Sequence, residues 1–462
     1  MNHSAAELAL VRSVQALLPR VKLVEERSLP GFSDVDPQDT REVVSANPAL
    51  LTLARARRVL LLQGPVGPFF DRLTRWLRNR GGHVERVAFQ QGDAADCQEI
   101  QPIRFHGSVA QWPAYFERLA TERRPDCVVL FGQMRVYHRI AREIAGRLGI
   151  TTIVTEEGYI RPGYITMEIG GVNGLSTTLD QFRWQPLADH VHHAPAVSGR
   201  APLIALPPAP RRRFLWQKMA WHAASHYFSM RRGLREFDAY THHRATSVLH
   251  YSSFWVASFT RKYFSALPDR ASEARLTSLP YFFVPLQHDG DSQITHHSPY
   301  RENTDFILEV MRSFADYAPA GALLVFKQHP QARGGLGHQR LIHAVAKEFG
   351  ISERVVHLIE GHTPSLVAGA LGVVVINSTV GLQALARKRP VMALGDALYG
   401  RPGLAFMGPL HQFWLRRPSP DSIKVDWFLE QLRRLTQVPC HVYDRREEPL
   451  TWFISPTSEP EA

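Results

Sequence analysis

Cysteine is scarce in this sequence, and long apolar runs are absent. The three cysteines, Cys97, Cys127 and Cys440, are too far apart to form a metal-binding pattern or a disulfide framework, so we expect a reducing compartment. No uncharged apolar run reaches ~18 residues, the length of a membrane-spanning helix. Glu7 and Arg12 interrupt the start of the chain, which argues against a signal peptide. We therefore expect a cytoplasmic protein, with or without contact to a membrane.

Acidic residues are too few to balance the basic ones. The 462-residue chain has 54 Lys and Arg against 43 Asp and Glu, a net charge of +11. This excess suits an anionic partner, which can be a nucleotide-activated substrate, an acidic polymer, an anionic lipid surface or a nucleic acid. Because no recognised nucleic-acid-binding motif accompanies the charge, we expect no nucleic-acid partner.

Strand patterns alternate with helical patterns in two parts of the chain, residues 57–185 and residues 276–410. This alternation predicts an α/β fold with two doubly wound, Rossmann-like lobes and a cleft between them. We call these parts the first lobe and the second lobe. The expected strands are short apolar runs at 58–62, 84–89, 126–132 and 150–154 in the first lobe, and at 281–286, 323–326, 355–358, 372–376 and 390–395 in the second.

Three further segments complete the expected organisation. Residues 1–56 form an N-terminal extension, and residues 411–462 form a tail for which a return to the first lobe is one option. The linker, residues 186–275, contains a basic and aromatic helical stretch at 211–232. This stretch either lies on an anionic membrane surface or buries its aromatic side chains in protein as an interdomain helix. The linker histidines lack a carboxylate or cysteine partner at helical spacing, so we predict no metal site at His190, His192 and His193.

Two adjacent carboxylates, Glu156 and Glu157, follow the apolar run at 150–154. Ligands of open α/β sheets bind at the carboxyl ends of the strands. Two neighbouring carboxylates repel each other, so we expect one of them to have a raised pKa and to handle a proton, while Arg161 lowers the pKa of the other. The alternative is a solvated acidic exit from the strand.

Glycines follow the first strand of the first lobe, in the turn that contains Gly64, Pro65 and Gly67. They let backbone N–H groups approach an anionic or polyhydroxyl ligand, or they only make a tight turn into the next helix. The prolines rule out the dinucleotide-binding fingerprint.

Basic and hydroxyl side chains follow the strands of the second lobe. Lys327 and the His329-Pro330 pair come after one strand, and Ser378-Thr379 precede a helix, where a phosphate binds well. His329, as a cation or a general acid, would stabilise a phosphate leaving group, although it can also be a structural histidine. One phosphate needs no metal, although Asp289-Gly290-Asp291 has the spacing of an Asp-x-Asp metal motif. The arrangement suits sugar transfer from a nucleoside monophosphate.

Several motifs recur in a fixed order along residues 57–410. They are the turn 63–70, Gly92-Asp93, Phe131-Gly132 with Arg135 and His138, the run 155–162, Gly171-Val172-Asn173-Gly174, Lys327 with His329-Pro330, and the run 377–385. In these motifs the chain resembles the KpsS-type capsule polysaccharide biosynthesis and export family. The resemblance implies a GT-B-like, CMP-Kdo-dependent glycosyltransferase, most simply a retaining β-Kdo transferase, that acts on a (lyso)phosphatidylglycerol at the cytoplasmic face of the inner membrane.

The resemblance also implies roles for individual residues. The acidic motif and the His-Pro motif are similar to those of bacterial sialyltransferases, in which the acidic residue is the base and the histidine contacts the CMP phosphate. In β-Kdo transferases the acid at the place of Glu157 is instead a nucleophile. The predicted catalytic residues are Glu157, Glu156 and His329; the donor-binding residues are Lys327, Pro330, Asn377, Ser378, Thr379 and Gln287; and the acceptor- or sugar-binding residues are Gly64, Pro65, Gly67, Arg135, His138 and Arg161.

The implied partners are a nucleotide-sugar donor, a phosphatidylglycerol-type acceptor, the inner-membrane surface and other capsule synthesis or export proteins. No cofactor and no metal is expected. Two other functions stay open: a non-catalytic export or assembly component that binds an anionic glycolipid, and a transferase for another CMP- or CDP-activated group.

Overall fold

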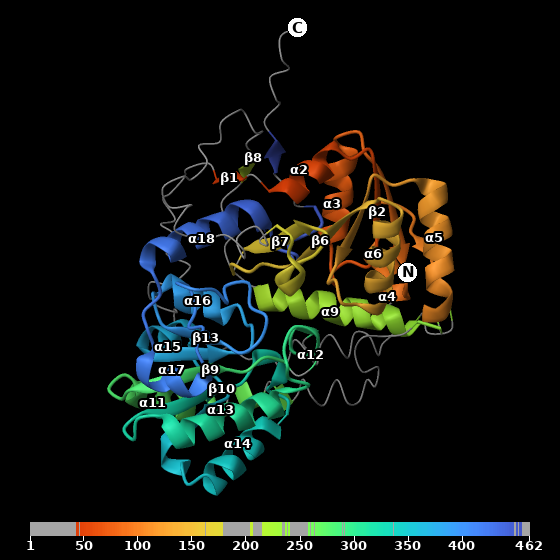
Figure 1. Cartoon of the computed structure of the whole chain (residues 1–462). Helices are drawn as coiled ribbons and strands as arrows, with labels where there is room; N and C mark the ends of the chain where they lie inside the picture. The colour runs from red at the N-terminus through yellow and green to blue at the C-terminus, as the bar shows by residue number, and fades with distance from the viewer. Residues whose placement is uncertain are drawn as a thin grey trace.

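A computed structural model gives the arrangement of the chain (Figure 1). It describes residues 43–45, 47–161, 163–178, 204–206, 215–232, 236–237, 239–240, 257–258, 260–262, 264–288, 290, 292–335, 337–447, 450 and 452–454.

The first lobe is built on a seven-stranded sheet with the order β14-β7-β6-β5-β2-β3-β4. The five strands from β4 to β6 are parallel, whereas β7 and β14 are antiparallel additions at one edge. The strands are β2 (Arg58–Leu61), β3 (His83–Ala88), β4 (Ile103–Arg104), β5 (Cys127–Phe131), β6 (Thr151–Glu157), β7 (Tyr164–Ile169) and β14 (Gln437–Pro439).

Helices cover the first sheet because each has an apolar side. In α3 (Phe69–Arg78), Leu73, Trp76 and Leu77 recur at helical spacing and are buried. The other helices of this lobe are α4 (Gln91–Ala95), α5 (Trp112–Arg123) and α6 (Val136–Arg147), with η1 (Val109–Gln111) and η2 (Asn173–Leu175) as short 3-10 turns.

The second lobe is built on a five-stranded, wholly parallel sheet with the order β11-β10-β9-β12-β13. Its strands are β9 (Tyr281–Pro285), β10 (Leu323–Lys327), β11 (Val355–Leu358), β12 (Gly372–Val375) and β13 (Val391–Ala393). Its helices are α11 (Ala266–Leu276), α12 (Ser292–His296), α13 (Asn303–Tyr317), α14 (Gly337–Glu348), α15 (Thr363–Gly369), α16 (Val380–Ala386) and α17 (Leu410–Arg416), with η3 (Pro330–Ala332) and η4 (Ser352–Arg354).

Both sheets reverse their strand order at one point. Counted along the chain, the parallel strands of each lobe follow the order 3-2-1-4-5, so the reversal lies between β2 and β5 in the first lobe and between β9 and β12 in the second. This is the doubly wound topology in which ligands bind beside the carboxyl ends of the strands. The predicted fold class, two Rossmann-like α/β lobes, is confirmed.

The two lobes share one apolar cluster through α18 (Ser422–Thr436). Phe428 and Leu432 of α18 belong to the same cluster as Val154 of the first lobe and Val373 of the second. The helix contacts both β7 and α16, so it joins the lobes physically. After α18, the chain enters the first sheet as β14.

Segments outside the two lobes also contribute to the first one. The helix α2 (Pro48–Arg55) buries Leu50 and Leu53 in the core beneath the first sheet. A separate three-stranded antiparallel sheet has the order β1 (Val43–Ser45), β8 (Ile204–Leu206) and β15 (Phe453–Ile454). Within the linker, α9 (Leu215–Arg232) runs along the first lobe beside α4 (Figure 1).

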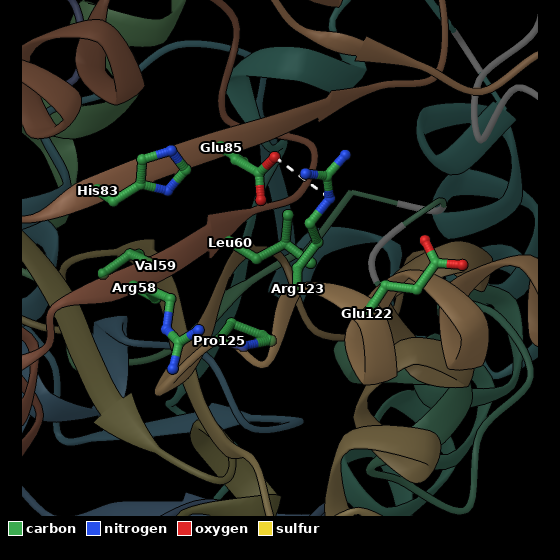
Figure 2. Close-up of a pocket in the computed structure, with 8 residues that line it drawn as sticks. All are labelled: Arg58, Val59, Leu60, His83, Glu85, Glu122, Arg123 and Pro125. Carbon is green, nitrogen blue, oxygen red and sulfur yellow. Dashed lines mark ion pairs between the residues drawn. The ribbon is translucent and has the colours of Figure 1, made fainter.

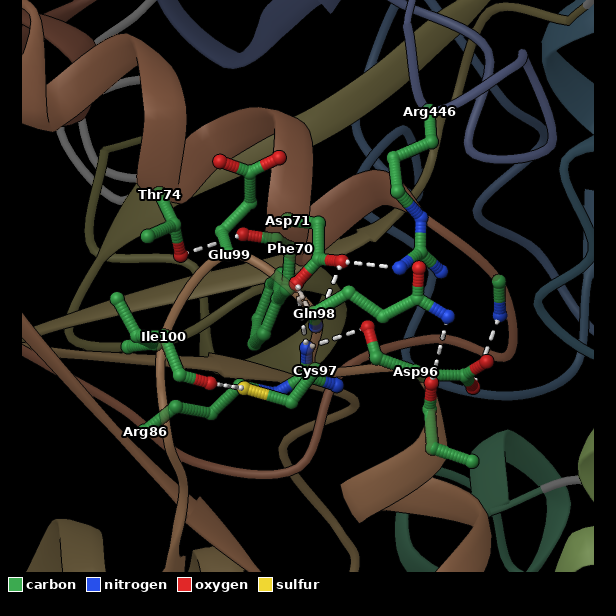
Figure 3. Close-up of polar contacts among 12 residues, drawn as sticks. Phe70, Asp71, Thr74, Arg86, Asp96, Cys97, Gln98, Glu99, Ile100 and Arg446 are labelled. Carbon is green, nitrogen blue, oxygen red and sulfur yellow. Dashed lines mark hydrogen bonds and ion pairs between the residues drawn. The ribbon is translucent and has the colours of Figure 1, made fainter.

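A buried charged cluster fixes the C-terminal segment to the first lobe (Figure 3). Asp71 of α3 is fully buried and lies 2.8 Å from Nη1 of Arg446 and 3.6 Å from Nη1 of Arg86. The backbone N–H of Gln98 donates to both of its oxygens. Burial raises the pKa of Asp71, while the Gln98 N–H and the two guanidinium groups oppose that rise.

We expect Asp71→Ala to lower the free energy of unfolding by about 3–5 kcal/mol, because it leaves the buried Arg86 and the partly buried Arg446 without their carboxylate. Urea unfolding followed by circular dichroism measures the change. Asp316→Ala, an exposed aspartate at the end of α13, is the matched control and should change it by less than about 0.5 kcal/mol. Equal effects of the two substitutions would show that the cluster does not stabilise the fold.

Candidate functional site

The lobes approach each other at the η2 turn of the first lobe. A Cβ atom placed on Gly174 would lie 2.6 Å from Nδ1 of His297 in the second lobe, so only glycine permits this close contact. His297 is buried, and its carbonyl accepts a hydrogen bond from Asn377, one of the predicted donor-binding residues. The η2 turn therefore joins the acidic motif to the second lobe.

Glu156 is held by two donors. Its Oε1 accepts from the backbone N–H of Gln133 at 3.3 Å, and its Oε2 accepts from Nδ2 of Asn173 at 2.9 Å. Asn173 has a φ of 54°, a left-handed conformation that asparagine tolerates better than most residues. Its own N–H donates to the hydroxyl of Tyr159 at 2.5 Å. Both carboxylate oxygens of Glu156 are thus engaged in holding the η2 turn.

Glu157 is more accessible. It pairs with Arg161, whose Nη1 lies 2.9 Å from its Oε2, and the two side chains are 44% and 48% exposed. Nε of Arg161 also donates to the carbonyl of Gly158. The sequence placed both acids beyond the strand as an interacting pair, but they are the last two residues of β6. Successive residues of a strand point to opposite faces, so the two carboxylates have separate partners.

Glu168 of β7, close to the acidic motif, has a raised pKa, and the sequence analysis missed it. It is 1% exposed, and burial raises its pKa to about 7, although hydrogen bonds from Ser176 and Tyr159 oppose the rise. Tyr159 donates to its Oε1 at 2.8 Å. Glu168 therefore holds the residues that position Asn173 against Glu156. A lone acid inside the apolar run of β7 is the signal that could have identified it.

The glycine turn after β2 is buried and internally bonded. The carbonyl of Gly64 accepts from Nη1 of Arg135 at 3.0 Å, and the N–H of Gly67 donates to Asp96 at 3.2 Å. Pro65 is buried between them. Arg135 also lies over the ring of Phe131, at the end of the neighbouring strand β5. The turn and Arg135 therefore come together at the strand-order reversal of the first lobe.

His138 links the turn after β2 to the turn after β5 by hydrogen bonds within the protein interior. It is fully buried; its Nδ1 donates to the carbonyl of Gly132 at 2.8 Å, and its Nε2 accepts from the N–H of Gln63 at 3.2 Å. Burial, followed by the charge of Arg135, lowers its pKa to about 3, so the ring is neutral at pH 7. In this position His138 braces the turn, and its burial keeps it from direct contact with a ligand.

His329 lies at the carboxyl end of β10 and begins η3. Its Nδ1 accepts from the N–H of Gln331 at 3.2 Å, which leaves the proton on Nε2. Burial lowers its pKa to about 4, and the charges of His288, Lys327 and Arg161 add to this effect. The expected imidazolium is therefore not the form of the free protein at pH 7, in which His329 is a neutral hydrogen-bond donor.

Lys327 and Pro330 flank that histidine differently. Pro330 is exposed at the first position of η3, whereas Lys327 is buried. Burial lowers the pKa of Lys327, and the nearby carboxylates of Glu360 and Glu273 oppose that effect. Lys327 therefore lies close to internal acids as well as to the strand end.

The remaining donor-side residues meet at the strand-order reversal of the second lobe. Nε2 of Gln287, just after β9, donates to Oδ1 of Asn377, just after β12, at 3.1 Å. Nδ2 of Asn377 donates to the carbonyl of Gln293. Oγ of Ser378 accepts from the N–H of Val380 at the start of α16. Ser378 and Thr379 are half-buried at that helix start.

The two lobes contribute charge to one place. Arg161 of the first lobe forms the ion pair with Glu157 and is near enough to the second lobe for its charge to lower the pKa of His329. A guanidinium of the first lobe, itself paired with a carboxylate, therefore lies within electrostatic range of a neutral imidazole N–H of the second. This set can hold an anion, stabilise a leaving group and attack or deprotonate a second molecule.

Two surface hollows contain none of the predicted site residues. One lies at the amino ends of β2 and β3, beside His83 and the ion pair between Arg123 and Glu85 (Figure 2). The other follows β13, between Met392 and Gly408. The first is at the opposite end of the sheet from Glu157, where ligands of this topology do not bind.

Within the part of the chain that the structure describes, no group of three or more His, Cys, Asp or Glu side chains is arranged to hold a metal ion. Asp289, Asp291, His190, His192 and His193 lie outside that part. All three cysteines are buried and free. Among the helices in the described ranges, none has both the length and the apolar character needed to span a bilayer.

The matching family model and two similar relatives are all described as capsule polysaccharide proteins. The model of the family described as "Capsule polysaccharide biosynthesis protein" matches residues 126–443. The capsule polysaccharide export protein KpsS of Escherichia coli is 33% identical over 398 residues, which cover 86% of this chain and 99% of KpsS. The capsule polysaccharide modification protein LipB of Neisseria meningitidis is 33% identical over 418 residues, 88% of this chain and 96% of LipB.

A solved structure is also similar. It is the KpsC β-Kdo 2,7 transferase of Thermosulfurimonas dismutans, with a TM-score of 0.37 and 14% identity over 81% of this chain and 88% of that one. At this TM-score the likeness carries no argument about function.

We predict that Glu168 makes stability fall as the pH rises. The unfolded chain releases this proton near the ordinary pKa of 4.5, whereas the folded protein keeps it until about pH 7. Relative to Glu168→Gln, the wild type should therefore lose up to about 3 kcal/mol of unfolding free energy between these two pH values. Urea unfolding at several pH values measures this loss. Glu353→Gln, an exposed residue of η4, is the control and should follow the wild type. Parallel curves for wild type and Glu168→Gln would contradict the prediction.

Proposed function

Because this chain belongs to the capsule polysaccharide biosynthesis protein family, we propose that it is a glycosyltransferase that uses CMP-Kdo. In this proposal it transfers Kdo to a (lyso)phosphatidylglycerol acceptor and so initiates the poly-Kdo linker of a capsular polysaccharide. The reaction takes place at the cytoplasmic face of the inner membrane, where the lipid acceptor is available, and other capsule synthesis or export proteins act on the product.

One observation carries the proposal: Arg161, which pairs with Glu157 in the first lobe, lies within electrostatic range of His329 of the second. A nucleotide-sugar transferase needs a group for the leaving phosphate and a carboxylate for the sugar carbon or the acceptor hydroxyl. In this proposal the second lobe supplies His329 for the leaving phosphate, and the first lobe supplies the carboxylate of Glu157. The donor's CMP lies against the second lobe, and the acceptor approaches from the first.

On the donor side, the neutral His329 donates its Nε2–H to the phosphate of CMP. An anionic phosphate beside the ring raises the pKa of His329 and so favours uptake of a second proton from solvent. The resulting imidazolium can give its Nε2 proton to the leaving oxygen and return to the neutral form. Ser378 and Thr379 add hydroxyl donors at the start of α16. One phosphate is thereby balanced by protein donors, and we propose no metal.

On the acceptor side, Glu157 is the reacting acid and Glu156 is a positioning residue. Both oxygens of Glu156 are already bonded to the protein, whereas Glu157 is partly exposed and held by Arg161 alone among the contacts described. In a retaining reaction, Glu157 bonds to the anomeric carbon as the bond to the CMP oxygen breaks. The acceptor hydroxyl then displaces Glu157 and loses its proton. In an inverting reaction, Glu157 instead takes that proton directly.

A second candidate is a non-catalytic export or assembly component that binds an anionic glycolipid. The printed name of the Escherichia coli relative, an export protein, favours it. This alternative predicts lipid binding without release of CMP, and a transferase for another CMP- or CDP-activated group predicts release with a different donor. A panel of donors, with detection of free CMP and CDP, separates the three.

We expect Glu157→Gln and His329→Ala each to lower the rate of CMP release by about 10²–10⁴, because each removes a group that acts on the reacting atoms. Purified protein, CMP-Kdo and a fluorescent lysophosphatidylglycerol are the reagents. His83→Ala is the matched control, since His83 lies at the opposite end of the first sheet. Full activity in both site variants would eliminate the mechanism.

A further inference from the structure

The linker helix α9 contacts the first lobe through polar side chains, and its Met230 is buried as well. Nζ of Lys218 lies 3.2 Å from Asp444, and the His222 ring stacks on that of Tyr443. One turn on, Nδ1 of His226 donates to Asp96 at 2.7 Å. These three polar contacts fix one side of α9, its inward face, to the first lobe.

The outward face of α9 carries the large apolar groups. Trp221 is 65% exposed, and Phe228, two turns later on the same side, is 40% exposed. Arg231 and Arg232 end this face, and the guanidinium of Arg232 lies over the Phe228 ring at 4.8 Å. The remaining exposed residues of the described side chains, Gln217, Ala224 and Ser225, fall on the same helical side. We call this set the outer face of α9.

The composition of the outer face indicates its partner. Tryptophan and phenylalanine are favoured at the boundary between lipid head groups and acyl chains, and arginine is favoured beside phosphate. Residues 215–232 contain no Asp or Glu, and the whole chain has a net charge of +11. A positive, aromatic helix face of this kind matches an anionic bilayer surface in both charge and polarity.

We propose that the outer face of α9 binds an anionic phospholipid bilayer, with α9 lying in the plane of the head groups. In this arrangement Trp221 and Phe228 enter the interface, and Arg231 and Arg232 contact lipid phosphates. The inward contacts through Lys218 and His226 keep the helix attached to the protein while the aromatic side faces lipid.

The position of α9 gives this binding a consequence for the active site. A Cβ atom on Gly67 would lie 3.3 Å from the ring of His222, and one on Gly92 would lie 2.7 Å from that of His226. The inward face of α9 therefore lies against the turns at the carboxyl ends of β2 and β3. Lipid binding by α9 would therefore place the bilayer beside the acceptor half of the site, and this consequence rests on the proposed function.

Vesicle co-sedimentation tests the binding without any reaction. The full chain is mixed with vesicles of phosphatidylcholine alone or of phosphatidylcholine with phosphatidylglycerol. We expect binding that requires phosphatidylglycerol and weakens with salt. The double substitution Trp221→Ser and Phe228→Ser should weaken it at least about 10-fold, and Arg231→Gln with Arg232→Gln should remove the preference for phosphatidylglycerol.

Tyr317→Ser is the matched control, because Tyr317 is an aromatic residue on the second lobe that is 52% exposed. It should bind vesicles as the wild type does, and circular dichroism should show that all variants are folded. Absence of wild-type binding, or equal binding by the α9 double variant, overturns the inference. Such results would also point to a protein as the partner of this face.

A measurement of CMP release with a short-chain, water-soluble acceptor distinguishes the lipid-binding proposal for α9 from the glycosyltransferase proposal. The Trp221→Ser and Phe228→Ser variant should retain this activity while losing vesicle binding. Activity without wild-type vesicle binding would refute only the lipid contact of α9. Vesicle binding without CMP release from any tested donor would refute only the glycosyltransferase proposal.

Discussion

The ion pair between Glu157 and Arg161 is the interaction on which the rest of the site depends. It puts a carboxylate at the end of β6 and a positive charge within electrostatic range of His329 of the other lobe. A parallel sheet presents its ligand-binding side chains at one edge only, so two such sheets make one site when those edges face each other. The apolar cluster through α18 and the close contact at Gly174 hold the edges in this relation.

Buried polar groups give the site its shape. In the first lobe, His138 joins the turn after β2 to the turn after β5, and Glu168 fixes the turn that carries Asn173. In the second lobe, Gln287 joins the end of β9 to Asn377 at the end of β12. Each strand-order reversal is therefore braced from within, so the groups exposed to a ligand do not have to hold the fold together.

Local patterns were sufficient to predict the parallel strands other than the two-residue β4, since a buried strand between helices reads as a short apolar run. They could not predict β7 and β14, because Gln437–Pro439 pairs antiparallel with Tyr164–Thr166 across more than half of the chain. Local patterns likewise could not predict that α2 packs beneath the first sheet or that Asp71 is buried with two arginines, because both arrangements depend on residues distant in the sequence. At the site, the pattern identified Glu156 and Glu157 but placed them beyond β6, since the hairpin that extends the strand depends on pairing with β7. The protonation of His329 depends on groups from both lobes, which no local pattern contains.

A titration of His329 tests most directly whether the two lobes meet at this point. The ring signals of His329 can be followed by NMR as a function of pH in the wild type and in Arg161→Gln, with His329→Gln used for assignment. Because the charge of Arg161 lowers the pKa of His329 in the folded protein, its removal should raise that pKa above the wild-type value of about 4. An unchanged pKa would contradict the account, since Arg161 and His329 would then be too far apart to act on one substrate.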